Sequence, residues 1–467
     1  MRIIHFGLGA FHRAHQAVYT AEAGDGWGIA AFTGRSPQAA TALSAQDGLY
    51  TLVVRAPDGD QTQIIGSLVE THDGAALDVL CDRAARSEVA VITLTITEAG
   101  YRLRPGDDAL ELDTSDPQVA ADIEALPRLL RDLVEGSRTL AATETAGPGL
   151  STAPARLVLA LAARRAAQAG GLAVVPCDNL PGNGAAAQAM VLGVAARVDG
   201  DLAAWVREHV SFVGTSVDRI TPKTTDQDRE EIAQVTGHDD VAPVITEPFS
   251  SWILAGDFPA GRPSWENAGA VFVDDVEPFE RRKLWLLNGA HSLLAYAGQN
   301  AGHSTVSSAI ADGTLRRAVE EFWDEACRHL PADGLDLAGY RAALVERFAN
   351  PRIAHRLAQI GGDGSLKLAA RQLPVLRAER QAGRPGTASL RALAAWAEHI
   401  TRSAAAGANL NDPAADSLHA ALSRPPAEQT AALLHVIDPH LAEDTDVVDA
   451  TESLRAAQQS PRRTQSL

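Results

Sequence analysis

The sequence contains little cysteine and no long apolar run without charges. Its three cysteines, Cys81, Cys177 and Cys327, are far apart and show no Cys-x-x-Cys spacing. This argues against a disulfide framework and against a cysteine zinc site. No apolar run reaches the roughly 18 residues of a membrane span. Residues 1–15 also lack the apolar core and cleavage site of a signal peptide, so we expect a cytoplasmic protein.

Basic residues are outnumbered, with 41 Lys and Arg against 59 Asp and Glu and a net charge of −18. This balance argues against nucleic acid and anionic membranes as partners, because both need basic surfaces. A small anionic substrate stays compatible, since a local pocket can oppose the global charge. The length of 467 residues is enough for two or three domains. The oligomeric state is left open, and a monomer is compatible with the sequence.

The chain opens on a short apolar run, a glycine turn and a helical pattern. The short run covers residues 2–6 and contains Ile3, Ile4 and Phe6, Gly7 and Gly9 form the turn, and the helical pattern runs from about residue 12 to 23. This order is typical of a dinucleotide-binding unit, where glycines let the backbone approach a pyrophosphate and the helix supplies N–H donors. His12 stands where a third glycine would fall. An ordinary strand-to-helix turn is therefore the alternative.

A second strand is predicted over residues 28–33, and its end bears on the choice of cofactor. An NAD site usually has an acidic residue there, which bonds the ribose hydroxyl groups. This chain has Gly34, Arg35 and Ser36 instead. Arg35 and Ser36 would suit the 2′-phosphate of NADP, although a solvated loop cation is the alternative for Arg35. NAD and NADP therefore both stay open.

Two later strands are also followed by polar residues. Glu98 and Tyr101 follow an apolar run over 89–96, and Asn179 follows a run over 172–175. In a doubly wound sheet, ligands lie outside the carboxyl ends of the strands. The Asn179 amide could donate a hydrogen bond to a substrate oxygen there, with turn and capping chemistry as the alternative.

The pattern changes about two thirds of the way along the chain. Before residue 278 strands still occur, and residues 63–69 and 211–215 are each predicted to form one strand. After residue 278 the chain is almost entirely helical in pattern. The sequence therefore predicts an α/β Rossmann-type domain over 1–274 and a mostly α-helical domain over 275–467.

Residues 280–298 read as a helix with three polar residues in an apolar setting. At about 100° per residue, Lys283, Asn288 and His291 can share one broad face. An amine, an amide and an imidazole in one cleft suit proton transfer and the binding of an oxygen atom. The alternative is a core helix whose lysine extends to water and whose histidine is satisfied by a neighbour.

The histidines near the N-terminus do not predict a metal site. No carboxylate or cysteine shares the local spacing of His5, His12 and His15, and Arg13 is a poor neighbour for a cation. We expect the residues that open this helix to lie near a phosphate instead.

Seven segments together resemble the polyol-specific long-chain dehydrogenases and reductases, the mannitol dehydrogenase family. They occur in the family's order and span most of the chain: GLGAFHRAHQ at 7–16, QDGLYTLV at 46–53, TITEAGY at 95–101, CDNLPGNG at 177–184, SVDRITP at 216–222, TEPFSSW at 246–252 and KLWLLNGAH at 283–291. The Lys-x4-Asn-x2-His spacing in the last segment is the most specific. The resemblance implies a nicotinamide-dependent oxidoreductase that needs no zinc.

The resemblance also implies roles for the matching positions. Lys283 matches the family's catalytic base, and His291 matches the imidazole that orients the substrate. Asn288 and Asn179 match the two amides that bond the reacting oxygen. Glu280 matches a carboxylate that gates release of the proton. Burial near a cationic nicotinamide would lower the pKa of Lys283 and make it available as a base.

The cofactor and substrate positions follow from the same segments. The expected cofactor contacts are in the glycine turn and at the strand ends: Gly7, Gly9, Phe11, His12, Arg13, Arg35, Ser36 and Glu98. The expected substrate contacts are Asp218, Lys367 and Arg371. The chain departs from the family at Ala99, where lysine is frequent, and in the missing acid after the second strand. The family therefore indicates NAD, whereas Arg35 suggests NADP.

Residues 355–374 bear on the substrate, because HRLAQIGGDGSLKLAARQLP looks like the fructuronate-reductase version of this region. Mannitol dehydrogenases tend to have arginine at the position of Gln359. Lys367 and Arg371 could bind the carboxylate of a sugar acid, which a polyol lacks, although a solvated helix face is the alternative for both. We favour fructuronate or mannonate as substrate. The rivals are a mannitol 2-dehydrogenase or another hexitol or pentitol dehydrogenase, and a non-catalytic dinucleotide-binding protein.

Overall fold

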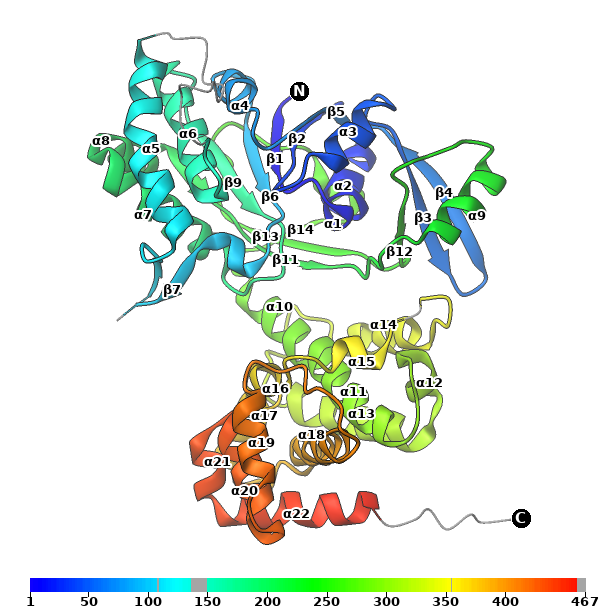
Figure 1. Ribbon diagram of the computed structural model, residues 1–467. Coiled ribbons are helices and arrows are strands. Elements are labelled where there is room, and N and C mark those ends of the chain that lie inside the picture. Colours follow the sequence, from blue (N-terminus) through cyan, green and yellow to red (C-terminus); the bar gives the residue numbers. More distant parts are fainter. Residues whose placement is uncertain (107–108, 136–148, 354, 460–467) are drawn as a thin grey trace. The chain divides into compact units, whose positions relative to one another are not determined.

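The computed structural model describes residues 1–106, 109–135, 149–353 and 355–459. Two compact units divide the chain, one over Met1–Glu277 and the other over Pro278–Leu467. The first is α/β and contains the sheets, and the second consists of helices in its described part (Figure 1). The predicted fold class is therefore confirmed.

A six-stranded parallel sheet forms the centre of the first unit. Its strands are β1 (Ile3–Phe6), β2 (Ile29–Phe32), β5 (Leu68–His72), β6 (Val91–Leu94), β9 (Leu172–Pro176) and β10 (Val210–Phe212). Their spatial order is β5-β2-β1-β6-β9-β10, with every neighbouring pair parallel. The chain therefore winds outward in both directions from β1 and β6. Dinucleotides bind at such a switch point, outside the carboxyl ends of the strands.

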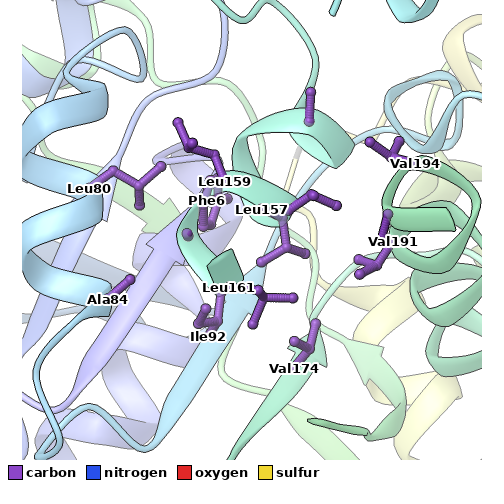
Figure 2. Close-up of a cluster of buried hydrophobic side chains, with 14 of the residues drawn as sticks. Phe6, Leu80, Ala84, Ile92, Leu157, Leu159, Leu161, Val174, Val191 and Val194 are labelled. Carbon is purple, nitrogen blue, oxygen red and sulfur yellow. The ribbon is translucent and has the colours of Figure 1, made fainter. Parts of the chain in front are cut away.

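Helices cover both faces of this sheet, which explains why its central strands are buried throughout. One face carries α4 (Leu77–Ala84), α5 (Pro117–Val134), α6 (Ala153–Ala166), α7 (Asn183–Val198) and α8 (Gly200–His209). Figure 2 shows side chains that meet in this layer, from the strands Phe6, Ile92 and Val174, and from the helices Leu80, Leu157 and Val191. The other face carries α1 (Ala10–Ala14), α2 (Gln16–Glu22) and α3 (Gln38–Ser44).

Smaller sheets complete the first unit. They are β12-β3-β4 (Val244–Thr246, Tyr50–Ala56, Gly59–Ile65), β11-β13-β14 (Gly214–Asp218, Ser251–Ala255, Val271–Phe272) and β7-β8 (Leu103–Pro105, Leu110–Leu112). The remaining elements are α9 (Asp226–Thr236) and the short 3-10 helices η1 (Glu98–Tyr101) and η2 (Trp265–Ala268).

The single strands expected over 63–69 and 211–215 are wrong, because each range belongs to two strands. The first contains the end of β4 and the start of β5, and the second contains β10 and the start of β11. The chain changes sheets at both places, from a hairpin with β3 to the parallel sheet, and from β9 to β13. Apolar periodicity within a short run cannot show that a strand has changed partner.

The second unit is built around α11 (Gly289–Asn300), which packs on α13, α15, α16 and α18. The order of its helices is α10 (Glu277–Arg282), η3 (Lys283–Asn288), α11, α12 (Val306–Ala311), α13 (Gly313–Cys327), α14 (Leu337–Ala349), α15 (Leu357–Ile360), α16 (Gly364–Arg371), α17 (Leu373–Gln381), α18 (Thr387–Ala405), α19 (Ala415–Leu422), α20 (Pro426–Ile437), α21 (Pro439–Glu443) and α22 (Thr445–Gln459). Within the described ranges, no helix is both long and apolar enough to span a bilayer.

The helix predicted over 280–298 is confirmed, but it contains a wide turn. η3 is π-helical, and the N–H of Gly289 donates to the carbonyl of Leu284, five residues earlier. Such turns are rare and often mark functional sites. Gly289 follows the wide turn directly and packs tightly, because a Cβ there would lie 2.5 Å from the Phe322 ring. The backbone of this segment therefore sits against the core with no room for a methyl group.

We expect Gly289→Ala to lower the free energy of unfolding by about 1–3 kcal/mol, because the methyl group would overpack a buried ring. Gly313→Ala is the matched control, since a Cβ at this first residue of α13 meets nothing within 4 Å. Urea unfolding of both variants and the wild type measures the effect. Equal stability of the two variants would contradict the packing argument.

Candidate active site

Gly7 turns the chain at the switch point between β1 and β6. Its φ is +101°, and a Cβ there would lie 2.0 Å from the carbonyl oxygen of Thr95, which follows β6. Only glycine fits a position with both constraints. Gly9 then begins α1, and its added Cβ would meet only the Gly7 carbonyl, at 3.6 Å. The turn is thus packed against the sheet at Gly7 and open at Gly9.

His12 does not reach the surface of this turn. Its side chain is fully buried and stacks on His5, with ring centroids 3.3 Å apart. Burial lowers the pKa of His12 well below its usual value and that of His5 to about 3, so both rings are neutral at pH 7. Any contact of His12 with a phosphate would come from its backbone. Phe11 is partly buried and stacks on His15 with centroids 5.1 Å apart.

The Arg13 side chain turns inward. Its Nε donates to the Gly9 carbonyl at 3.2 Å, and its Nη1 donates to the Ala242 carbonyl. The Tyr50 hydroxyl donates to the carbonyl of Arg13 at 2.6 Å. These bonds connect α1 to the segment that leads into β12. A role for the Arg13 side chain at the cofactor stays a prediction.

The structure places three further predicted cofactor residues and the predicted catalytic residue Asn179 at the same edge of the sheet. Arg35 and Ser36 are exposed in the loop after β2, and Glu98 is exposed at the start of η1, after β6. Asn179 is exposed after β9. All four follow the carboxyl ends of parallel strands, where a dinucleotide and its substrate are expected. The residues present therefore fit a nicotinamide dinucleotide.

A buried acid next to Asn179 was not singled out by the sequence. The Asp178 carboxylate accepts a hydrogen bond from the Tyr101 hydroxyl at 2.6 Å, and both side chains are buried. Burial raises the pKa of Asp178 to about 6, against the hydrogen bond from Tyr101, which lowers it. This pair joins the chain after β6 to the chain after β9 and so fixes the residue that precedes Asn179. The only sequence signal was a polar residue after a buried strand.

The wide turn of η3 governs the predicted catalytic residues of the second unit. Lys283 and Asn288 are the first and last residues of η3, and both are partly buried. In a regular α-helix they would lie about 140° apart around the axis. An i→i+5 turn brings them closer to one side. The Lys-x4-Asn spacing is thus suited to a π-helical turn rather than to an α-helical one.

Side chains from outside this helix bind the carbonyl groups of the wide turn and the residue after it. The three bonds are Trp323 Nε1 to Leu286 at 2.8 Å, Arg371 Nη1 to Asn288 at 3.3 Å, and Gln372 Nε2 to Gly289 at 2.7 Å. Buried carbonyl groups need such donors wherever the regular helical pattern is interrupted. The sequence reading missed Trp323 and Gln372, whose spacing to the helix is set only by the tertiary fold.

His291 is 7% exposed and lies between two rings. Phe348 is 4.8 Å away between centroids, and His355 is 4.9 Å away and almost perpendicular. Its pKa is lowered well below the usual value by burial and by the nearby His355, Arg347 and Arg371. The buried Nε2 has no hydrogen-bond partner among the described residues. A neutral imidazole with an unused nitrogen is suited to a substrate hydroxyl group.

Arg371 joins this cluster as a partly buried cation. Its Nη1 donates to the Ser292 hydroxyl at 2.9 Å as well as to the Asn288 carbonyl. Burial lowers the pKa of Arg371 to about 10, and the nearby Tyr296 opposes this shift. Within the described ranges, no carboxylate forms an ion pair with Arg371. A guanidinium that is partly removed from water without an anionic partner costs stability, which makes Arg371 a candidate for an anionic ligand.

Lys367 lies one turn before Arg371 on α16, but its side chain is bonded to a different part of the chain. Its Nζ donates to the carbonyls of Ile360 and Gly362 at 3.2 and 2.6 Å and lies 3.6 Å from Asp363. Burial, with Arg371 next, lowers its pKa. Lys367 therefore holds the glycine-rich segment before α16, and its contact with substrate stays a prediction.

The two remaining predicted residues are acidic. Glu280 is partly buried in α10, three residues before Lys283. Asp218 is buried at the end of β11, where it pairs in register with Ser251 of β13. Their roles stay predictions. Among the described residues, no group of three or more His, Cys, Asp or Glu side chains is placed to hold a metal ion.

The raised pKa of Asp178 predicts a pH-dependent stability. Between about pH 4 and pH 6 the unfolded carboxyl ionises while the folded one stays protonated, so stability falls as pH rises and stays lowered above pH 6. We expect Asp178→Asn to be more stable than the wild type at pH 7.5 by about 2–3 kcal/mol, with a smaller difference at pH 4.5. Urea unfolding at both pH values measures this, with the exposed Asp239→Asn as control. If the difference in stability between Asp178→Asn and the wild type did not change with pH, the raised pKa of the buried Asp178 carboxyl would be refuted.

Comparison with known proteins agrees with this geometry. Residues 1–267 match the mannitol dehydrogenase Rossmann domain, and residues 275–457 match the mannitol dehydrogenase C-terminal domain. The chain is 38% identical over 443 residues to the Escherichia coli uncharacterized oxidoreductase YeiQ, covering 92% of this chain and 85% of that protein. It is 36% identical over 395 residues to the E. coli D-mannonate oxidoreductase, covering 82% and 76%.

A solved structure is also similar over nearly the whole chain. The Pseudomonas fluorescens mannitol 2-dehydrogenase, in ternary complex with NAD and D-mannitol, matches with a TM-score of 0.77 and 32% identity. The match covers 98% of this chain and 92% of that protein. With both domain matches, a glycine turn at the switch point and the Lys-x4-Asn-x2-His helix, the chain belongs to the mannitol dehydrogenase family of oxidoreductases.

Proposed function

We propose that this enzyme transfers a hydride between a nicotinamide cofactor and a secondary alcohol or ketone carbon of a sugar acid, with fructuronate and mannonate as the substrate pair. Arg371 is the observation that carries the choice of a sugar acid over a polyol. Its guanidinium is partly buried, has no carboxylate partner among the described residues and is hydrogen-bonded to the backbone of Asn288. A substrate carboxylate would supply the missing anion, whereas a polyol carries none.

The roles of the other residues follow from their chemistry and from the family resemblance. Lys283 takes the hydroxyl proton when the alcohol is oxidised and returns it in the reverse direction. Asn288 and Asn179 donate hydrogen bonds to the reacting oxygen, where negative charge develops. His291, kept neutral, orients a substrate hydroxyl group, and Glu280 passes the proton on from Lys283. The bound nicotinamide supplies or accepts the hydride, and no metal ion is required for these roles.

The D-mannonate oxidoreductase relative supports this choice, since it is 36% identical over most of this chain. The mannitol 2-dehydrogenase structure supports the rival polyol reading, with 32% identity over 98% of this chain. Both assignments share Lys283, Asn288 and His291. They differ in whether Arg371 meets a negative charge, so a test on Arg371 separates them.

Lys283→Ala tests the catalytic assignment. We expect turnover to fall by about 100- to 10,000-fold, the usual contribution of a positioned base, while reduced cofactor still binds. Stopped-flow or steady-state assays give the rate, and cofactor fluorescence gives the binding. Lys223→Ala, in the loop before α9, serves as a lysine control. Near-normal turnover by Lys283→Ala would remove Lys283 from the proposal.

Arg371→Met tests the substrate class. We expect kcat/KM for fructuronate to fall by about 10- to 100-fold, because a charge-assisted hydrogen bond is lost. The low activity with fructose should change much less, since fructose has no carboxylate. The matched control is Arg377→Met. Arg377 lies on α17, and its guanidinium pairs with Asp438 at 2.7 Å. An equal loss for both substrates would show that Arg371 acts by holding the helix at Asn288, and would overturn its role as the partner of a substrate carboxylate.

A further inference from the structure

The end of β2 carries a second arginine that the local sequence does not reveal. Arg35 is exposed in the loop after β2. Arg156, near the start of α6, reaches the same loop and donates from Nη1 to the Gly34 carbonyl at 3.0 Å. Arg156 lies 121 positions after Arg35 in the chain, yet it bonds Gly34, the residue directly before Arg35. Two positive charges therefore lie at the strand end where the cofactor's adenosine ribose is expected.

The Arg156 side chain is held in place from several directions. Its Nε donates to the Leu150 carbonyl at 3.0 Å. Gly74, which follows β5, leaves room for it, because a Cβ there would lie 2.5 Å from Arg156 Nη1. The N–H of Gly74 donates to the Thr33 hydroxyl at 3.0 Å, which joins the loops after β2 and β5. The guanidinium is thus a fixed part of this strand edge.

Among the described residues, no carboxylate forms a direct ion pair with Arg156. The nearest carboxylates that act on its pKa belong to Asp122 and Asp73, and neither is bonded to it among the described residues. Asp122 accepts hydrogen bonds from Ser151 and Thr152. Asp73 accepts one from the N–H of Ala75 at 3.0 Å. Nη2 of Arg156 has no partner in the described part of the chain.

We propose that Arg156 and Arg35, with the Ser36 hydroxyl, form a subsite for the 2′-phosphate of NADP(H). This inference rests on the proposed function, in which the first unit binds a nicotinamide dinucleotide. A guanidinium group matches phosphate oxygens in geometry and charge, and a serine hydroxyl adds a donor. The unphosphorylated cofactor would leave Arg156 and Arg35 without an anion at this edge. Arg156 is therefore a specificity residue that distinguishes the phosphorylated cofactor.

Binding of adenosine 2′,5′-bisphosphate and of adenosine 5′-monophosphate to the full chain tests the proposal without any assay of activity. The two probes differ only in the 2′-phosphate. By isothermal titration calorimetry, we expect the bisphosphate to bind at least tenfold more tightly. Arg156→Met should remove most of this preference and leave affinity for the monophosphate unchanged, whereas Arg156→Lys should retain part of it. Arg165→Met, on the same helix and 3.3 Å from Asp199, is the control that should change neither affinity.

The outcomes separate the possible failures. Equal affinity of the wild type for the two probes would overturn the 2′-phosphate subsite and leave the dehydrogenase assignment standing. Loss of monophosphate binding in both Arg156→Met and Arg156→Lys would show that Arg156 only maintains the fold, and would also overturn it. No binding of either probe by the wild type would contradict the cofactor role of the first unit, and with it the proposed function.

Discussion

The hydrogen bonds that three side chains donate to the helix carbonyls near residues 286–289 are the constraint on which the second unit depends. A π-helical turn leaves the regular backbone pattern, and Trp323, Arg371 and Gln372 supply donors at this place. The wide turn that they accompany brings Lys283 and Asn288 toward one side. Arg371 has two tasks here, since the same guanidinium that bonds Asn288 also carries the charge proposed for the substrate carboxylate.

Each unit of this acidic protein has an arginine at a place where an anionic ligand is proposed. The chain carries a net charge of −18, yet its proposed ligands are anions. Arg371 in the second unit and Arg156 in the first are both partly buried, and neither has a carboxylate in direct contact among the described residues. Each is held by hydrogen bonds to backbone carbonyls, which orient a guanidinium without neutralising it. A guanidinium held in this way is ready to bind an anion, and it lowers the stability of the fold while no anion is bound.

Much of the fold was predictable, because its signals are local. The glycine turn at Gly7, the apolar runs of the parallel strands and the helix over 280–298 each follow from short-range sequence patterns. The changes of sheet at Gly66 and between β10 and β11 were not predicted, because strand partners are chosen by tertiary packing. The π-helical turn was missed for a similar reason, since its donors come from α13 and from the end of α16.

The candidate site could be predicted only in part. Spacing and the family resemblance point to Lys283, Asn288, His291 and Asn179, whose roles stay predictions. Asp178 and His355 were missed, because only burial and contact with Tyr101 or His291 distinguish them. Arg156 lies in a helix whose sequence gives no sign that its side chain reaches the loop after β2.

The most direct test of the central claim is the loss of reduced-nicotinamide absorbance when the enzyme is given fructuronate, tagaturonate, fructose or xylulose with NADH or NADPH. We expect the highest kcat/KM with fructuronate, well above that with fructose. Faster oxidation with fructose than with either sugar acid would contradict the substrate assignment. No oxidation with any of the four substrates would contradict the function as a whole.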